Sequence, residues 1–198
     1  IVTKPNRVTR TFTQQLVAEP AKVFPLLCPV READWIDGWD PLVVFSESGT
    51  AEPDCVFLTQ ASPGNAIWYI TRHEPGNGFV EMIKITPTVT ACKLTIQLRP
   101  VEGGSEAIIT YAHTSLGPEG DAFVESFTEE HYREFMRDWE ARINITFPAG
   151  VFSVHQVADI YLSFGFQKKI LLCQPASSQF ISEADYCGKE QTSTECNH

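Results

Sequence analysis

The stretch CPVREADWIDGWDP, residues 28–41, marks the point where the chain passes from a first strand to a long series of strands. It carries two tryptophans, Trp35 and Trp39, and four acidic residues between two prolines. A buried tryptophan covers on the order of 150–250 Å² of surface, so such side chains belong in a core or against a ligand. Connectors held over a rigid scaffold often carry binding residues. The stretch therefore predicts either a plug at one end of the core or one wall of a ligand site.

The residues before this connector predict one strand and one short helix. Residues 8–18 (VTRTFTQQLVA) alternate in polarity and are rich in Thr, Val and Phe, which favours a strand. Residues 20–27 (PAKVFPLL) predict a helix of about two turns, because Pro25 inside it prevents a longer one.

Six short segments separated by turn signals follow the connector. We expect strands at residues 42–46, 55–60, 66–73, 79–86, 91–99 and 106–116. The dipeptide Asn77-Gly78 is a hairpin marker. Consecutive strands at spacings of about ten residues indicate an antiparallel meander. Leu94, Ile96 and Leu98 alternate with polar residues, so we expect one buried and one solvated face.

The period of the pattern changes at residues 118–145, which predict a long amphipathic helix. At 100° per residue, one broad sector of this helix is apolar and the opposite sector is charged. The apolar sector contains Val124, Phe127, Tyr132, Phe135, Trp139, Ile143 and Ile145. His131 falls inside the same sector. The capping-box pattern Ser126-x-x-Glu129 predicts a break into two helices near Ser126.

This order of elements predicts an α+β domain of residues 1–147. We expect a curved seven-stranded antiparallel sheet, two short helices after the first strand and a long C-terminal helix over the concave face. One helix leaves that face either filled by bulky side chains or hollowed into a cavity for an apolar ligand. Residues 148–198 lose clear periodicity after residue 172. We expect them to form a partly disordered C-terminal extension, to which the pattern assigns no function.

Composition excludes several classes of protein. The net charge of −10 argues against nucleic-acid binding, and no run of residues is long and apolar enough to span a membrane. The six cysteines form no CxxC pair, which favours buried thiols in a reducing compartment and predicts a cytoplasmic protein. The five histidines lack the spacings of metal ligands, so we expect no metal and no other cofactor. The oligomeric state is not indicated by the sequence.

Several local stretches resemble one superfamily. They are residues 23–32 (VFPLLCPVRE) with Trp35 and residues 38–41 (GWDP), then residues 56–59 (VFLT), 67–70 (IWYI), 85–87 (ITP), 110–111 (TY), 114–116 (TSL) and 127–130 (FTEE). Together with the element order they resemble the START-like superfamily, also called SRPBCC, and especially its uncharacterised bacterial members. The resemblance covers about residues 8–145. Cys28, where a residue such as threonine is expected, and the residues after 147 depart from the pattern.

The resemblance implies the Bet v 1-like helix-grip fold, which hosts binding, transport and catalysis. Our first expectation is the binding or carriage of a small hydrophobic ligand in a cavity between the sheet and the C-terminal helix. One alternative is a polyketide cyclase/aromatase-like enzyme, a lyase that closes and dehydrates its substrate. Another is a protein-interaction module, which would show an exposed apolar patch instead of an enclosed cavity.

Three polar residues, His131, Tyr111 and Glu32, are candidates for catalysis. His131 could act as an acid or base near neutral pH, or be a boundary histidine bonded to water. Tyr111 and His113 share a strand face with Ile109, which favours an inward direction. Glu32 over an apolar pocket would have a raised pKa, or it could be a surface carboxylate or helix cap. The ligand-binding candidates are Trp35, Trp39, Phe57, Trp68, Tyr111, His113, Phe127, His131, Phe135 and Trp139.

Overall fold

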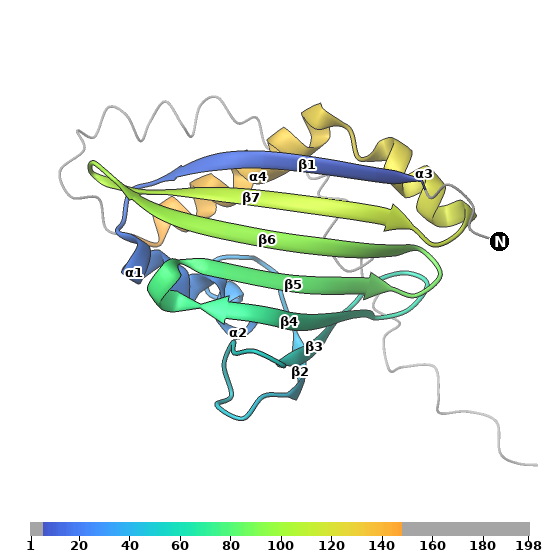
Figure 1. Ribbon diagram of the computed structural model, residues 1–198, viewed down its shortest axis with the longest axis horizontal. Helices are drawn as coiled ribbons and strands as arrows, with labels where there is room; N and C mark the ends of the chain where they lie inside the picture. The colour runs from blue at the N-terminus through green and yellow to red at the C-terminus, as the bar shows by residue number, and fades with distance from the viewer. Residues whose placement is uncertain (1–5, 148–198) are drawn as a thin grey trace, which may run out of the picture.

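A computed structural model describes residues 6–147 and confirms the predicted α+β helix-grip architecture (Figure 1). The elements are β1 (Arg7–Leu16), α1 (Pro20–Val23), the 3-10 helix η1 (Phe24–Leu27), α2 (Pro29–Glu32), β2 (Leu42–Phe45), β3 (Val56–Thr59), β4 (Ala66–Glu74), the 3-10 helix η2 (Pro75–Asn77), β5 (Phe79–Thr86), β6 (Thr90–Val101), β7 (Gly104–Ser115), α3 (Pro118–Ser126) and α4 (Glu129–Ile145). The predicted C-terminal extension, residues 148–198, lies outside the described residues.

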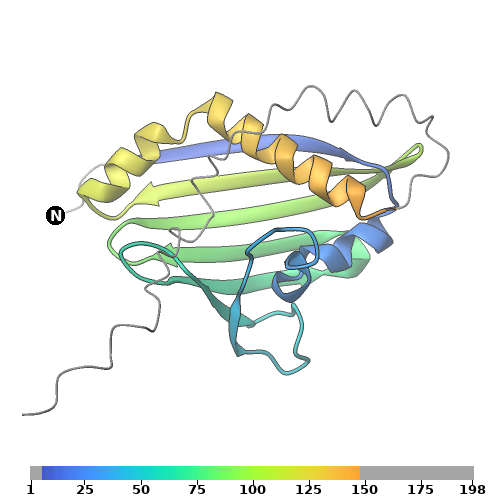
Figure 2. The ribbon, with the colours of Figure 1, turned by 180° about the vertical axis from the view of Figure 1, so that it is seen from behind.

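The seven strands form one antiparallel sheet in the order β1-β7-β6-β5-β4-β3-β2. Strands β2 to β7 form the predicted meander, and β1 joins it beside β7 over its whole length. The helix α4 lies across the concave face, with α1 and α2 beside it (Figure 2). This arrangement places the residues that follow β1 directly opposite the C-terminal helix.

The predicted break between the two C-terminal helices is confirmed, but its cap is Thr128, not Ser126. The backbone of Thr128 is extended, and its Oγ1 accepts a hydrogen bond of 3.2 Å from the His131 amide. Ser126 instead donates its hydroxyl to the carbonyl of Phe123 within α3. The residue immediately before the first helical turn is the one that can satisfy the unpaired amides of that turn.

The buried face of α4 is a narrow stripe formed by Tyr132, Met136, Trp139 and Ile143. Ile145, which we predicted to lie in the apolar sector, is 68% exposed. It lies two residues beyond Ile143 and is therefore turned about 200° around the helix axis.

Two buried hydrogen bonds fix α4 on the sheet. The side-chain amide of Gln14 donates to the carbonyl of Met136 over 2.7 Å, and the Tyr132 hydroxyl donates to the carbonyl of Ile109 over 2.8 Å. Both hydrogen bonds join a side chain to backbone far away in the chain, so they define the height of the helix above the sheet.

The two edges of the sheet differ in their protection. At β1, side chains of α4 bind the outer backbone groups: Glu140 accepts from the Gln15 amide, and Asn144 accepts from the Val17 amide and donates to the Gln15 carbonyl. At the other edge, no strand among the described residues pairs with the outer side of β2. The sequence of β2, LVVF, contains no charge or proline of the kind that blocks edge pairing.

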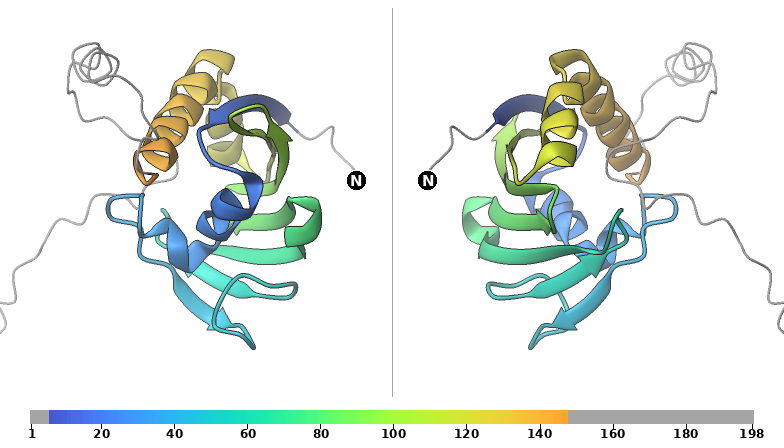
Figure 3. Two further views of the ribbon diagram at one scale, coloured as in Figure 1. Left: turned by 90° about the vertical axis from the view of Figure 1, so that its left-hand side faces the viewer. Right: turned by 90° about the vertical axis from the view of Figure 1, so that its right-hand side faces the viewer.

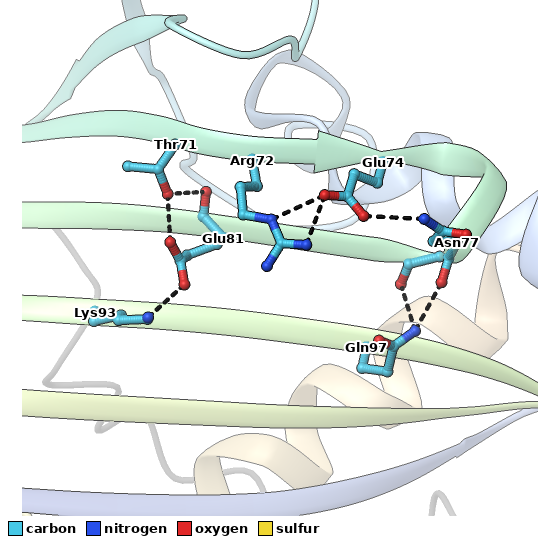
Figure 4. A network of polar contacts seen from close by, with 8 residues as sticks. Thr71, Arg72, Glu74, Asn77, Glu81, Lys93 and Gln97 are labelled. Carbon is cyan, nitrogen blue, oxygen red and sulfur yellow. Dashed lines mark hydrogen bonds and ion pairs between the residues drawn. The ribbon is translucent and has the colours of Figure 1, made fainter.

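The outer face of the sheet is divided into a polar and an apolar part. Over β4, β5 and β6 a network of polar contacts joins Thr71, Arg72, Glu74, Asn77, Glu81, Lys93 and Gln97 (Figure 4). Beyond it, register places eight apolar residues in two rows across β2 to β5. We call this the outer apolar patch: Leu42, Phe45, Val56, Leu58, Ile67, Tyr69, Ile83 and Ile85. Four of them are exposed.

The turn between β5 and β6 packs directly on α3. A Cβ atom at Gly120 would lie 1.9 Å from the carbonyl oxygen of Val89, so only glycine fits this contact. The close approach holds α3 over the end of β7 and positions the junction with α4.

The predicted buried thiols are found in the described part of the chain. Cys28 and Cys55 are buried free cysteines, and Cys92 is buried beside His113. Cys173, Cys187 and Cys196 lie outside the described residues. No helix within residues 6–147 is long and apolar enough to cross a membrane.

Candidate functional site

A small cavity lies between the concave face of the sheet, α4 and the connector that follows β1. It is lined by Glu32, Trp39, Phe57, Trp68, Met82, Leu94, Tyr111 and Trp139. The strands supply the floor, Trp139 of α4 supplies one wall, and Glu32 and Trp39 supply the other. Figure 3 shows the helical segment after β1 and the C-terminal helix on the same side of the curved sheet. The volume of the cavity is about 10 Å³, which is room for roughly one water molecule. Bulky side chains therefore fill most of the space between the sheet and α4, which we call the lid helix.

Glu32, at the end of α2, is the ionisable carboxyl of this cavity. It is 7% exposed, and no hydrogen bond or ion pair reaches its carboxyl group from residues 6–147. Burial raises the pKa of Glu32 from 4.5 to about 8. A carboxyl group without a partner in an apolar site keeps its proton near neutral pH, because desolvation penalises the charged form. The surface-carboxylate alternative for Glu32 is therefore wrong.

Tyr111 lines the same cavity from β7. It is 2% exposed, and its ring centroid lies 5.9 Å from that of Tyr132. The predicted inward direction of this strand face is confirmed, because Ile109 and His113 are buried together with Tyr111. Glu32 and Tyr111 thus come to one cavity from positions far apart in the chain.

The two tryptophans of the connector have different positions. Trp39 lines the cavity, remains half-buried, and donates its indole N–H to the carbonyl of Pro29 over 2.7 Å. Trp35 is buried and lies outside the wall, with its ring edge-on to Trp139 at 5.3 Å and its N–H on the carbonyl of Leu26. Trp35 therefore plugs the core, whereas Trp39 lines the cavity.

The floor of the cavity contains a stacked pair of rings. Phe57 of β3 and Trp68 of β4 are register partners, with centroids 5.4 Å apart and planes 10° from parallel. Trp68 donates its indole N–H to Thr59 over 2.9 Å. Lys84 places its ammonium group 4.9 Å from the centroid of Trp68, but it does not line the cavity.

His113 belongs to a separate buried cluster beyond the cavity. Its Nε2 lies 3.7 Å from the Sγ of Cys92, and its ring contacts Phe123 and Phe127 at 4.9 and 4.7 Å. Burial, assisted by the charge of Lys84, lowers the pKa of His113 from 6.5 to about 3. The imidazole is therefore neutral at physiological pH and acts as an aromatic core residue.

Three further candidates on the C-terminal helices lie outside the cavity wall. Phe127 is buried at the junction of α3 and α4, beside His113. Phe135 is half-buried, 5.2 Å from the ring of Trp139. His131 is also half-buried and lies one position, or 100°, away from the buried stripe of α4 at Tyr132.

Sequence reasoning did not identify Met82 and Leu94 as wall residues. Both belong to apolar strand patterns, which mark burial but do not distinguish a cavity wall from the rest of the core. The pairing of Cys92 with His113 also depends on the register of β6 and β7, which has no local signal. Within the described residues, no group of His, Cys, Asp or Glu side chains could hold a metal ion.

Comparison with solved structures finds the same architecture. The chain is similar to the structure of Ara h 8.0201 at a TM-score of 0.52 and 15% identity, covering 69% of this chain and 97% of that one. It is similar to the Mll3558 protein from Rhizobium loti at a TM-score of 0.53 and 16% identity, covering 71% and 99%. It is also similar to norcoclaurine synthase from Thalictrum flavum, solved with dopamine and hydroxybenzaldehyde, at a TM-score of 0.54 and 11% identity, covering 75% and 97%.

These similarities establish the fold alone. No protein-family model matches the chain, and comparison with curated proteins finds no relative. Ara h 8.0201, norcoclaurine synthase and the Mll3558 protein share the architecture, so the residues of the cavity carry the functional argument.

Proposed function

We propose that this chain, which has the Bet v 1-like helix-grip fold, binds a small and mainly apolar ligand in the cavity between sheet and lid helix. The observation that carries the proposal is Glu32, a buried carboxyl without a partner among residues 6–147, inside a wall of aromatic rings. An apolar side chain at this position would make the fold more stable, because burying a polar group without a partner costs free energy. A buried carboxyl group of this kind is typical of a functional site.

The size of the cavity supports a compact ligand over a long acyl chain. About 10 Å³ accommodates one water-sized group, so a ring-sized ligand enters only when a wall side chain moves. Trp39 is the half-buried member of the wall, and it follows Gly38, whose φ is +73°. The norcoclaurine synthase structure with its two aromatic compounds supports the idea that this architecture admits ligands of that size.

Truncation of Trp39 tests this role. We expect Trp39→Ala to bind phenethyl alcohol about tenfold more tightly than the parent protein, because the ligand no longer has to displace the indole. Isothermal titration calorimetry measures the effect. Phe45→Ala removes an aromatic ring that is 50% exposed and far from the wall, and serves as the matched control. Equal affinities in Trp39→Ala and the parent would contradict Trp39 as the residue that gates the cavity.

A polyketide cyclase/aromatase-like enzyme would use the same residues. It needs two titratable groups in one pocket, and the joint lining by Glu32 and Tyr111 supports that requirement. Glu32 would act as the protonated acid near neutral pH. Conversion of a bound compound that is lost in Glu32→Gln would favour the enzyme, whereas recovery of the compound unchanged would favour a binding protein.

The outer apolar patch favours a protein-interaction module as a second candidate function. The patch is continuous with β2, an uncharged edge strand whose outer side has no partner within residues 6–147. The occupant we propose is a second copy of the chain, because antiparallel pairing of two β2 strands would join two uncharged edges and two apolar faces about a twofold axis. At the opposite edge, side chains of α4 bind the backbone of Gln15 and Val17 and so block pairing at that end of β1.

A charge on this edge tests the second candidate. Val44 is 59% exposed on β2, so Val44→Lys should leave the fold intact and convert a dimer into a monomer. Sedimentation velocity of the full chain measures the state of both proteins, with Thr11→Lys on β1 as the control at the opposite edge. A parent protein that is monomeric at all concentrations would remove this candidate.

A further inference from the structure

The cavity wall offers a ligand one carboxyl group and a surround of aromatic rings. The rings belong to Trp39, Phe57, Trp68, Tyr111 and Trp139. Within the described chain, no lysine, arginine or histidine lines the cavity. The lining therefore contains one carboxyl group and several electron-rich rings, and the nearby ammonium group of Lys84 lies outside it, 4.9 Å from the centroid of Trp68.

The hydrogen-bond donors of two indoles are already used by the protein. Trp39 donates to the carbonyl of Pro29 and Trp68 donates to Thr59. The N–H groups of these two rings are therefore not available to bind an anion. A carboxylate ligand would bring its charge into a largely apolar cavity whose lining contains no cation, so the wall disfavours acids.

A cation satisfies both features of the wall. Aromatic faces attract ammonium groups through their quadrupole, and the attraction grows when the site is desolvated. Glu32 has no ion-pair partner among residues 6–147, so a bound cation would supply the missing counter-charge. An ammonium group is about the size of a water molecule, which is the size of the cavity beside these residues.

Building on the function proposed above, we infer that the ligand is a primary amine on a compact aromatic body, with its ammonium group beside Glu32. The ring of the ligand takes the space that Trp39 leaves when it moves, and the ammonium group takes the existing cavity. A protonated amine that binds here releases the proton of Glu32 to solvent, so charge is conserved in the site. An amine that arrives as the free base takes that proton instead.

Three compounds of matched shape test this inference: phenethylamine, phenethyl alcohol and phenylacetic acid. On the full-length parent protein near neutral pH we expect the amine to bind at least about tenfold more tightly than the alcohol, and the acid not to bind. In Glu32→Gln the preference for the amine over the alcohol should disappear. Glu102→Gln, an exposed carboxylate in the β6–β7 hairpin, is the matched control and should retain the preference. Calorimetry in buffers of different ionisation enthalpy reads out the proton released by Glu32.

The outcomes separate this inference from the proposed function. Equal binding of amine and alcohol by the parent protein would overturn the amine assignment and leave a neutral ligand site in place. An amine preference that survives Glu32→Gln would also overturn it, because the cation would then bind elsewhere. Failure of all three compounds to bind the parent protein and Trp39→Ala would overturn the proposed function itself.

Discussion

Replacing Glu32 by glutamine is expected to remove a large loss of stability that the parent protein suffers as pH rises. The pKa of Glu32 is about 8 in the folded protein and 4.5 in the unfolded chain. Between these values the folded state holds a proton that the unfolded chain has released. The free energy of unfolding therefore falls with increasing pH, by up to about 5 kcal/mol in total. The stability is fully present below pH 4.5 and is lost as pH rises through about 8.

Urea unfolding at a series of pH values measures this effect. At a pH of about 8 we expect Glu32→Gln to be about 2–3 kcal/mol more stable than the parent, because the buried amide keeps part of the desolvation cost. Near pH 4.5 the two proteins should be close in stability. Glu102→Gln should follow the parent curve at every pH. Parallel curves for Glu32→Gln and the parent would show that Glu32 ionises normally and is not buried as described.

Replacing His113 by phenylalanine is expected to protect the protein against acid. The pKa of His113 is about 3 when folded and 6.5 when unfolded, so the unfolded chain binds the extra proton between these values. The stability is present above pH 6.5 and is lost as pH falls through about 3, by up to about 5 kcal/mol. Phenylalanine keeps the ring contacts with Phe123 and Phe127 and cannot be protonated.

Acid unfolding followed by circular dichroism checks this prediction. At a pH of about 4 we expect the free energy of unfolding of His113→Phe to exceed that of the parent by about 3 kcal/mol. Near neutral pH the two proteins should be similar in stability. His131→Gln changes a half-buried histidine on the surface of α4 and serves as the control. An acid midpoint that His113→Phe leaves unchanged would contradict a neutral, buried imidazole.

The two groups act in opposite directions and together shape the pH profile. Between pH 4.5 and 6.5 the loss caused by Glu32 and the gain caused by His113 nearly cancel, so these two groups leave the stability nearly flat there. Above that range Glu32 dominates, and below it His113 dominates. A bound amine would supply a counter-charge for the ionised form of Glu32 and should make the loss of stability at alkaline pH smaller.

Local signals explain why the elements could be predicted. Strand β4 ends shortly before Asn77-Gly78, and β5 begins directly after it. The turn forms there because glycine readily adopts the left-handed conformation found at Gly78. The dry face of β6 at Leu94, Ile96 and Leu98 was visible as strict alternation, and all three are buried. These features depend on residues close together in the chain.

The site could be predicted only in part, because it depends on contacts between distant segments. The sequence marked Trp35 and Trp39 equally, and only the packing of the connector buries Trp35 against Trp139 and places Trp39 in the lining of the cavity. The burial of Glu32 depends on how α2 packs against the sheet and α4. The small size of the cavity depends on side-chain packing, about which hydrophobic periodicity says nothing.

The most direct test of the ligand site uses the two methionines of the chain, Met82 and Met136. Met82 lines the cavity, whereas Met136 is buried on α4 and does not line it. Isotope-labelled methionine methyl groups give one NMR signal for each residue, so the second is an internal control. On titration with phenethylamine we predict a saturable shift of the Met82 signal and a nuclear Overhauser effect to the ligand ring, with Met136 little changed. Saturable binding that leaves the Met82 signal unmoved would contradict a ligand site in this cavity.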